Sequence, residues 1–295
     1  MGKGSSSSPS VAPHVLIFPF PAQGHINSML KLAELLALSG LRVTFLNTEH
    51  VQGQLDRFTH TKSRLETLYP GFSFKTVPDG LPSDHPRSGD SISELFDSMN
   101  SRARPVLKEL LTGSDPVNCV ISDGVVSFGL EVAMEVGIPV VHFRTISACA
   151  MWTYFCIPDL IEAGELPIKG EEDMDRLITK VRGMEGFLRC RDLPRICRVT
   201  DMKHPSLWTV ASATRQSSQP RGLILNTFEY LEGPILSLIR TNINPNTYTI
   251  GPLHELLKTK LESATRPPSS DLWKADRGCL KWLDDQPPRS VIYVS

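Results

Sequence analysis

Apolar residues along the chain fall into short continuous runs separated by amphipathic stretches, and the first unit of this kind is the clearest. Residues 15–18 are all apolar, as in a strand that is buried on both faces. The proline-containing stretch 19–21 ends this run, and from Ile26 the apolar positions recur at helical spacing as far as Gly40. The next strand is expected at residues 41–46, Leu-Arg-Val-Thr-Phe-Leu. The pattern predicts a strand, a helix and a strand, joined as a right-handed crossover between parallel strands.

The same alternation continues through most of the chain. Further strands are expected at residues 72–77, 118–122, 138–143, 222–226 and 248–252. Helices are expected at residues 92–111, 130–136, 149–161 and 230–239. The segment 164–220 is less periodic. Alternating strands and helices predict an α/β fold with a doubly wound, Rossmann-like parallel sheet.

Changes in composition divide the chain into four parts. Residues 1–13 form a serine-rich tail that we expect to be disordered, and residues 14–252 form the first domain. The stretch 253–275 includes a Pro-Pro-Ser-Ser sequence with little apolar content and is interpreted as an interdomain linker. Residues 276–295 then predict a helix and the start of a buried strand, the opening elements of a second domain. Such a strand needs neighbours on both sides, so we expect the rest of that domain to be missing.

Composition narrows the classes of partner. The 295 residues carry a formal net charge of -1, with 31 basic and 32 acidic residues in no long blocks, so a nucleic-acid or membrane partner is not indicated. No run reaches the roughly 18 apolar residues of a membrane helix, and no signal peptide is recognisable. Six well-separated cysteines without a C-x-x-C pair indicate neither a metal site nor a disulfide framework. We expect a cytoplasmic monomer with a small-molecule partner.

Two titratable residues follow strands that we expect to be neighbours. In an open parallel sheet, ligands bind beyond the carboxyl ends of the strands where the strand order reverses, and the usual order 3-2-1-4-5 places the first and fourth strands there. His25 follows the first strand and Asp123 ends the fourth. The carboxylate would hold one ring nitrogen while the other takes a proton from a substrate hydroxyl. A helix N-terminus near His25 favours the neutral imidazole that a base requires.

Other interpretations of these residues stay open. A histidine in a strand-to-helix loop also serves as a capping or hydrogen-bonding residue, and Asp123 is equally suited to a helix N-cap. The loop has no G-x-G-x-x-G and no P-loop spacing, which argues against nicotinamide and nucleotide-hydrolase chemistry. Ser122 and Ser147 lack a G-x-S-x-G context, which argues against a hydrolase.

Five segments in a fixed order carry a resemblance to a known family. They are Phe-Pro-Phe-Pro-Ala-Gln-Gly-His-Ile-Asn (18–27), Cys-Val-Ile-Ser-Asp-Gly (119–124), Gly-Leu-Ile-Leu-Asn-Thr-Phe-Glu-Tyr-Leu-Glu (222–232), Tyr-Thr-Ile-Gly-Pro-Leu (248–253) and residues 279–295. Over nearly everything after residue 13, the sequence resembles the plant UDP-sugar-dependent glycosyltransferases that act on small molecules. Residues 14–48 and 141–149 are most similar to the branch that glucosylates iridoids such as 7-deoxyloganetic acid.

The resemblance implies a two-domain GT-B enzyme that inverts the sugar configuration. Glucose would pass from UDP-glucose, a co-substrate, to a hydroxyl or carboxyl group of a small apolar, phenolic or terpenoid acceptor, without cofactor or metal. In this family the residues that match His25 and Asp123 are the base and its partner. The chain ends before the tryptophan-, histidine- and glutamine-rich signature that holds the UDP-sugar. A catalytically inactive, acceptor-binding fragment is therefore the alternative.

The acceptor is expected to lie beyond the carboxyl ends of the strands, where apolar and aromatic residues coincide with irregular backbone. We expect the loop 78–90 and the region around Phe187 to contribute to its cavity. Aromatic residues at helical spacing, such as Trp152, are also common in cores. The individual acceptor-binding candidates are Phe20, Gln23, Gly24, Ser147 and Trp152.

Overall fold

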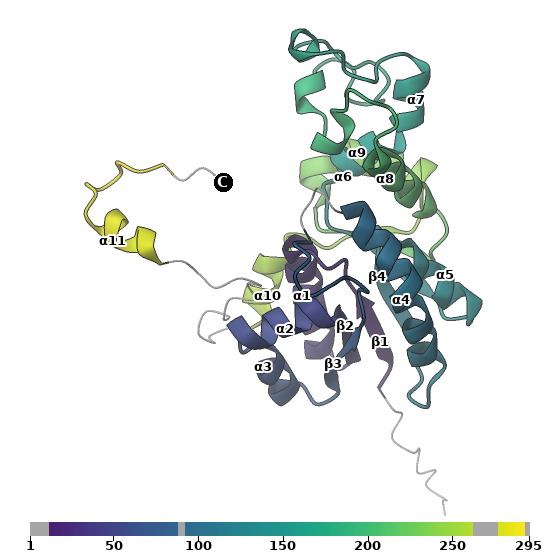
Figure 1. The fold of residues 1–295 in the computed structure, drawn as a ribbon, viewed down its shortest axis with the longest axis vertical. Coiled ribbons are helices and arrows are strands. Elements are labelled where there is room, and N and C mark those ends of the chain that lie inside the picture. Colours follow the sequence, from purple (N-terminus) through teal and green to yellow (C-terminus); the bar gives the residue numbers. More distant parts are fainter. Residues whose placement is uncertain (1–11, 88–91, 262–276, 293–295) are drawn as a thin grey trace, which may run out of the picture.

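The computed structural model of the chain describes residues 12–87, 92–261 and 277–292. Its strands are all parallel and form one seven-stranded sheet in the order β3-β2-β1-β4-β5-β6-β7, with helices on both faces (Figure 1). The predicted doubly wound α/β fold is confirmed, and the expected strand order is extended by two strands. The strands are β1 (His14–Phe18), β2 (Arg42–Thr48), β3 (Phe72–Val77), β4 (Cys119–Asp123), β5 (Val140–Arg144), β6 (Gly222–Leu225) and β7 (Thr247–Thr249).

Helices α1 to α9 lie between successive strands, and α10 and α11 follow the last strand. They are α1 (Gln23–Leu38), α2 (Glu49–Phe58), α3 (Thr61–Leu68), α4 (Ile92–Thr112), α5 (Ser127–Glu135), α6 (Ala148–Phe155), α7 (Ile157–Glu162), α8 (Pro205–Gln216), α9 (Glu229–Asn242), α10 (Leu253–Lys260) and α11 (Gly278–Asp284). Three short 3-10 turns, η2 (Glu171–Asp173), η3 (Cys190–Asp192) and η4 (Arg195–Cys197), lie between α7 and α8. Within the described ranges, no helix has the length and apolar character needed to cross a membrane.

The central strand β1 contributes to two separate apolar clusters. Val15 and Ile17 join the cluster formed with α1, α2 and α3 on one face of the sheet. Leu16 and Phe18 join the cluster formed with α4 and α5 on the other face. Because successive side chains of a strand point to opposite faces, a continuous apolar run has to be covered on both sides. This explains why the four-residue apolar run predicts the strand so well.

The segment between β5 and β6 differs most from the sequence-based expectation. Residues 149–161, expected as one helix, form α6 and α7 with a break at Cys156. Pro158 lacks the amide hydrogen that a continuous helix would use and occupies the first turn of α7 instead. The segment 164–220 contains α8, which is not among the predicted elements. These parts share a third apolar cluster with α9 and β6, and they lie above the sheet in Figure 1.

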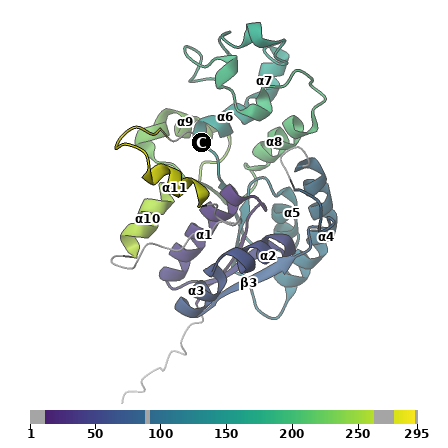
Figure 2. The ribbon, with the colours of Figure 1, turned by 60° about the vertical axis from the view of Figure 1, so that its left-hand side comes forward.

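Part of the predicted linker is helical. Residues 253–260 form α10, which lies beside α1 (Figure 2). Leu253 and Leu257 of this helix are buried, and Leu253 belongs to the apolar cluster of the α1 face. The structure therefore differs from the expected linker at its start, because α10 extends the core of the first domain. Residues 262–275 of the linker lie outside the described residues, as does the tail up to residue 11.

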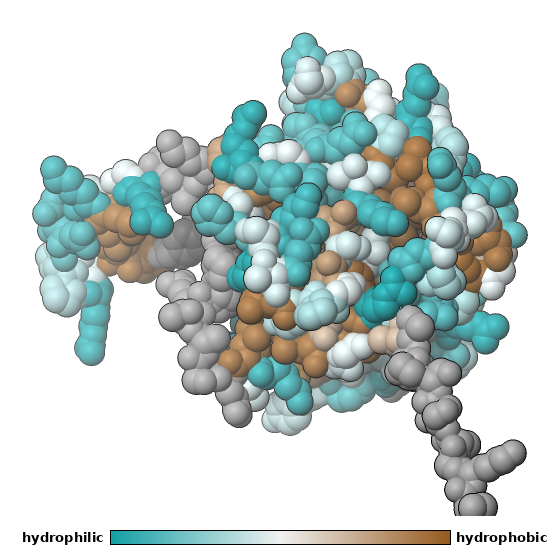
Figure 3. Space-filling model, turned by 90° about the horizontal axis from the view of Figure 1, so that it is seen from below, coloured by the Kyte–Doolittle hydropathy of each residue, from teal (hydrophilic) through white to brown (hydrophobic). Residues whose placement is uncertain are grey.

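The helix predicted at 276–283 corresponds to α11, which has no buried residue. Leu280, Trp282 and Leu283 are exposed and give α11 an apolar surface, at the left in Figure 3. Exposed apolar patches of this kind are typical of segments that contact another part of a protein. Val291 and Ile292 form no strand, and the end of the strand predicted at 290–295 lies outside the described residues.

Candidate active site

His25 lies in the first turn of α1, directly after the loop that leaves β1. The backbone of Ala22 is extended and begins the helix, and the His25 amide donates to the Ala22 carbonyl at 3.0 Å. Pro19 and Pro21 have no amide hydrogen for the sheet ladder, so the chain leaves the sheet here. The imidazole is thereby presented at the carboxyl edge of β1, with its side chain 25% exposed.

Asp123 is the last residue of β4, the strand that pairs with β1 at the point where the strand order reverses. Its Oδ2 lies 2.6 Å from Nδ1 of His25. A carboxylate only accepts hydrogen bonds, so Nδ1 carries the hydrogen and Nε2 of the neutral ring is left as the acceptor. The structure thus brings together the two residues expected as base and partner, with the orientation that the chemistry requires.

The Asp123 carboxylate is buried but well supplied with donors. The amide of Phe20 donates to Oδ2 at 3.3 Å, and the amide of Val125 donates to Oδ1 at 3.2 Å. Burial raises the pKa of Asp123, but the charge and hydrogen bond of His25, the guanidinium of Arg144 and the Val125 amide outweigh burial, so its pKa is lowered overall. Asp123 is therefore held as an ionised acceptor for the ring of His25.

Thr145 is a site residue that the sequence reasoning missed. Its Oγ1 lies 3.1 Å from Nδ1 and 3.5 Å from Nε2 of His25. It directly follows β5, so it reaches the same sheet edge as Asp123. The sequence could have indicated Thr145, because it is a polar residue directly after the strand next to β4, at the edge of the sheet where ligands bind. Phe20 contacts the other side of the ring edge-on, with ring centroids 5.3 Å apart.

The acceptor-binding candidates lie in different surroundings. Phe20 is buried and stacks on Phe96 of α4 at 4.8 Å between centroids. Gln23 and Gly24 lie in the first turn of α1, and Gly24 is exposed with open space at its Cα. Trp152 is 3% exposed in the cluster around α6 and α8, where its indole N–H donates to the Arg182 carbonyl. The structure therefore places Trp152 in the core.

Ser147 is exposed and acts as the N-cap of α6. Its Oγ accepts from the Ala150 amide at 3.1 Å. Glu232 completes this cap from α9, because its carboxylate accepts from the amides of Ala148 and Cys149 at 3.0 and 2.9 Å. Since α6 begins three residues after Thr145, this cap also fixes the segment that reaches His25.

Replacing Glu232 by alanine is expected to lower the free energy of unfolding by about 1–2 kcal/mol, the range for loss of a helix cap. Urea unfolding followed by circular dichroism measures this change. Glu162→Ala, at the exposed end of α7, is the matched control and should change the value by less than about 0.5 kcal/mol. Equal losses in the two variants would show that the Glu232 carboxylate does not stabilise α6.

A single arginine organises the described part of the loop expected at the acceptor site. Arg87 binds both carboxylate oxygens of the buried Asp79, at 2.8 and 3.1 Å. Its guanidinium also donates to the carbonyls of Leu81, Pro82 and His85. Five hydrogen bonds from one side chain hold residues 79–87 in one conformation. The remainder of this loop, 88–90, lies outside the described residues.

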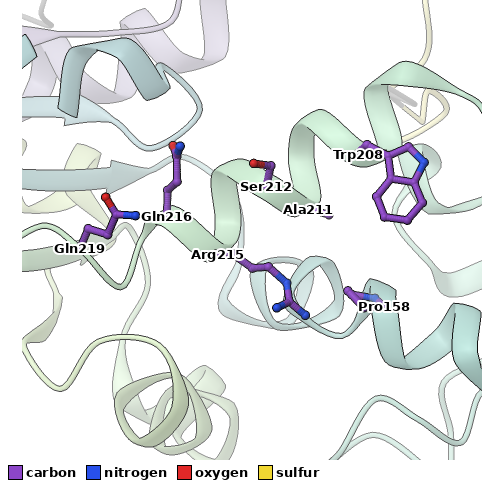
Figure 4. A pocket seen from close by; sticks show the side chains of 7 residues that line it. All are labelled: Pro158, Trp208, Ala211, Ser212, Arg215, Gln216 and Gln219. Atoms are coloured by element: carbon purple, nitrogen blue, oxygen red, sulfur yellow. The ribbon is translucent and has the colours of Figure 1, made fainter. Parts of the chain in front are cut away.

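Two cavities lie on either side of α8. One, of 300 Å³, is lined by residues of α4, α5 and α8 and includes Phe96. Phe96 in its wall stacks on Phe20, whose ring in turn contacts His25, but neither Phe20 nor His25 lines this cavity. The other, of 320 Å³, is shown in Figure 4. It is lined by Pro158, Trp208, Ala211, Ser212, Arg215, Gln216 and Gln219, none of which was predicted as a site residue.

Comparisons with known proteins show which sequences the chain resembles. The family described as "Glycosyltransferase, N-terminal domain" matches residues 10–135. A 7-deoxyloganetic acid glucosyltransferase of Catharanthus roseus is 48% identical over 98% of this chain and 62% of its own length. A 7-deoxyloganetin glucosyltransferase of the same plant is 38% identical over all of this chain and 62% of its own length.

Solved structures share the fold. Os79 of O. sativa in complex with UDP superimposes with a TM-score of 0.68 at 23% identity, over 93% of this chain and 59% of that one. Phytolacca americana UGT2, complexed with UDP-2fluoro-glucose and pterostilbene, gives a TM-score of 0.65 at 22% identity, over 94% of this chain and 57% of that one.

The fold and its matches define the N-terminal domain of a GT-B glycosyltransferase. Over nearly its whole length the chain is similar to plant UDP-glycosyltransferases, among them glucosyltransferases named for 7-deoxyloganetic acid and 7-deoxyloganetin. It spans about 62% of the length of these curated relatives.

Proposed function

We propose that this chain supplies the acceptor site and the catalytic base of an inverting, UDP-glucose-dependent glucosyltransferase. The observation that carries the proposal is the 2.6 Å contact between Nδ1 of His25 and Oδ2 of Asp123 at the point where the strand order reverses. Ligands of open parallel sheets bind at this point. A histidine held there by a buried carboxylate has the geometry of a general base.

The reaction that this arrangement would perform has a simple balance of bonds and protons. Nε2 of His25 removes the proton of the acceptor hydroxyl while the oxygen forms a bond to the anomeric carbon of glucose. The bond from that carbon to the phosphate oxygen breaks on the opposite face, and UDP leaves with the bonding electrons. Asp123 stabilises the imidazolium that forms. A carboxylic acid acceptor is already ionised at pH 7, so His25 would then position it more than deprotonate it.

The proposed acceptor class is a small plant metabolite of the iridoid type. The support is the similarity to a relative named for 7-deoxyloganetic acid and to another named for 7-deoxyloganetin. The ring of Phe20 beside His25, with Phe96 stacked on it, offers apolar surface that such a molecule would bury.

A chimera tests the proposal directly. Residues 1–295 are followed by the C-terminal remainder of the Catharanthus roseus 7-deoxyloganetic acid glucosyltransferase and incubated with UDP-glucose and 7-deoxyloganetic acid. We expect a glucoside of inverted anomeric configuration and one UDP released per glucoside, detected by mass spectrometry and NMR. The C-terminal part alone is the control and should transfer nothing. A folded chimera that binds the acceptor without transferring glucose would favour the alternative, a catalytically inactive acceptor-binding fragment.

A further inference from the structure

A buried arginine at the carboxyl end of β5 lacks most of its hydrogen-bond partners. Arg144 is 2% exposed, and its Nη2 donates to Oγ1 of Thr214 on α8 at 3.3 Å. Nε and Nη1 are buried and have no hydrogen-bond partner among the described residues. Removing a guanidinium from water without a full set of partners is strongly unfavourable, so this side chain requires a compensating charge.

The charge of opposite sign that acts on Arg144 is the carboxylate of Asp123, although the two groups form no direct hydrogen bond. A Cβ added to Gly124, the residue after Asp123, would lie 2.5 Å from Cδ of Arg144, so the arginine side chain passes directly against this backbone. The guanidinium lowers the pKa of Asp123, and Asp123 in turn favours the charged form of Arg144 against its burial. Asp123 also binds Nδ1 of His25, so one carboxylate interacts with both the guanidinium of Arg144 and the imidazole of His25.

The other groups that face Arg144 are neutral near pH 7. Burial, with the charge of Arg144 as a smaller cause, lowers the pKa of His142 on β5 to about 4. Burial raises the pKa of Tyr154 on α6 to about 12. From α8 the facing group is the hydroxyl of Thr214. Arg144 and Asp123 are therefore the opposite charges of this buried cluster.

We propose that Arg144 is a positioning residue of the His25–Asp123 pair and acts through the shared carboxylate of Asp123. This inference rests on the function proposed above for the pair. With Arg144 present, Asp123 stays ionised and accepts the hydrogen bond from Nδ1 of His25. Nε2 of the ring is then left as the acceptor for a substrate proton.

The first test uses the 295-residue chain itself and needs no catalytic activity. The carboxyl carbon of Asp123 is followed by NMR in ¹³C-aspartate-labelled protein between pH 2 and 7. In Arg144→Met, which keeps the length of the side chain and removes the charge, we expect the Asp123 titration to move to higher pH by about one unit or more. Arg144→Lys restores a charge and should move the titration back toward the parent value. Arg215→Met, at an exposed position of α8, removes the same charge elsewhere and should leave it unchanged.

Thermal unfolding of the same variants separates this role from a purely structural one. We expect Arg144→Met to fold with a lower Tm, because removing one member of a buried pair of opposite charges is destabilising, while Asp123 keeps its hydrogen bonds with His25 and the amides of Phe20 and Val125. An Asp123 titration that is unchanged in Arg144→Met would overturn the proposal. A Met variant that does not fold would also overturn it, because Arg144 would then be required for the fold instead of the pair.

The chimera gives a second, independent readout. In Arg144→Met we expect the acidic limb of the kcat/KM profile to move to higher pH by about one unit, with little change in KM, because Asp123 then takes up a proton at higher pH and no longer accepts from the ring of His25. A loss of activity without displacement of this limb would contradict the proposed role. If the parent chimera transfers no glucose, the proposed function fails, whereas the NMR titration still decides whether Arg144 acts on Asp123.

Discussion

Replacing His25 by alanine in the chimera is expected to lower kcat for transfer to an alcohol by roughly 100-fold or more, the range for loss of a positioned general base. The physical reason is the arrangement around the ring. Asp123 holds Nδ1 at 2.6 Å, so Nε2 is the atom left to take the acceptor proton. Without the imidazole, water would have to take this proton. The measurement is the release of UDP at saturating UDP-glucose and acceptor.

The controls for this experiment separate base catalysis from damage to the fold. Asp123→Asn should slow transfer less than His25→Ala as long as the ring keeps a hydrogen bond to position 123. His60→Ala, at an exposed position before α3, should leave kcat unchanged. If His25→Ala turned over an alcohol at close to the parent rate, the assignment of His25 as the base would be wrong.

The parallel sheet could be predicted because its strands are short runs of apolar or β-prone residues. Residues 15–18 form a continuous apolar run and residues 72–77 alternate β-prone and polar residues, and the structure places β1 and β3 there. The helix α8 was missed because its buried positions include polar Thr214 and small alanines, so no apolar stripe marks it. Its burial results from packing against distant elements of the third cluster, which a local pattern does not reveal.

The candidate site was predicted only as far as topology determines it. A known strand order places the ends of β1 and β4 side by side, and His25 and Asp123 follow from that placement. The contacts of Thr145, Arg144 and Glu232 depend on side-chain direction and on where α8 and α9 cross the sheet. Side-chain direction and helix crossing are properties of packing, so these contacts cannot be predicted from periodicity or motif spacing.

The second large effect concerns stability in acid and centres on His142. This residue is fully buried in β5, where Nε2 has no partner among the described residues and Nδ1 lies 3.5 Å from Oγ of Ser217. Burial, and to a lesser extent the charge of Arg144, lowers its pKa from 6.5 to about 4. The unfolded chain therefore binds a proton at this residue between about pH 6.5 and 4 that the folded chain does not. The stabilising contribution is complete above pH 6.5 and is lost as the pH falls toward 4, by about 3 kcal/mol in total.

Replacing His142 by leucine should remove this loss. At pH 7.5 we expect the free energy of unfolding to change by no more than about 1 kcal/mol, because a buried nitrogen without a partner is exchanged for an apolar side chain. At pH 4.5 the variant should exceed the parent by about 2–3 kcal/mol relative to that baseline. Urea unfolding at pH 4.5, 5.5, 6.5 and 7.5 measures the difference, and the exposed His60→Leu is the control.

Other titratable groups do not account for the expected difference. His14 and His50 also have pKa values lowered by burial, but they are present in both proteins, so their contributions cancel when the free energies of unfolding are subtracted. Asp123, whose pKa is lowered, loses its contribution only below the unfolded value near 4. If the free energy of unfolding depended on pH in the same way in the parent and in His142→Leu, the prediction would be wrong. His142 would then take up its proton in the folded chain without loss of stability, and another group would cause the sensitivity to acid.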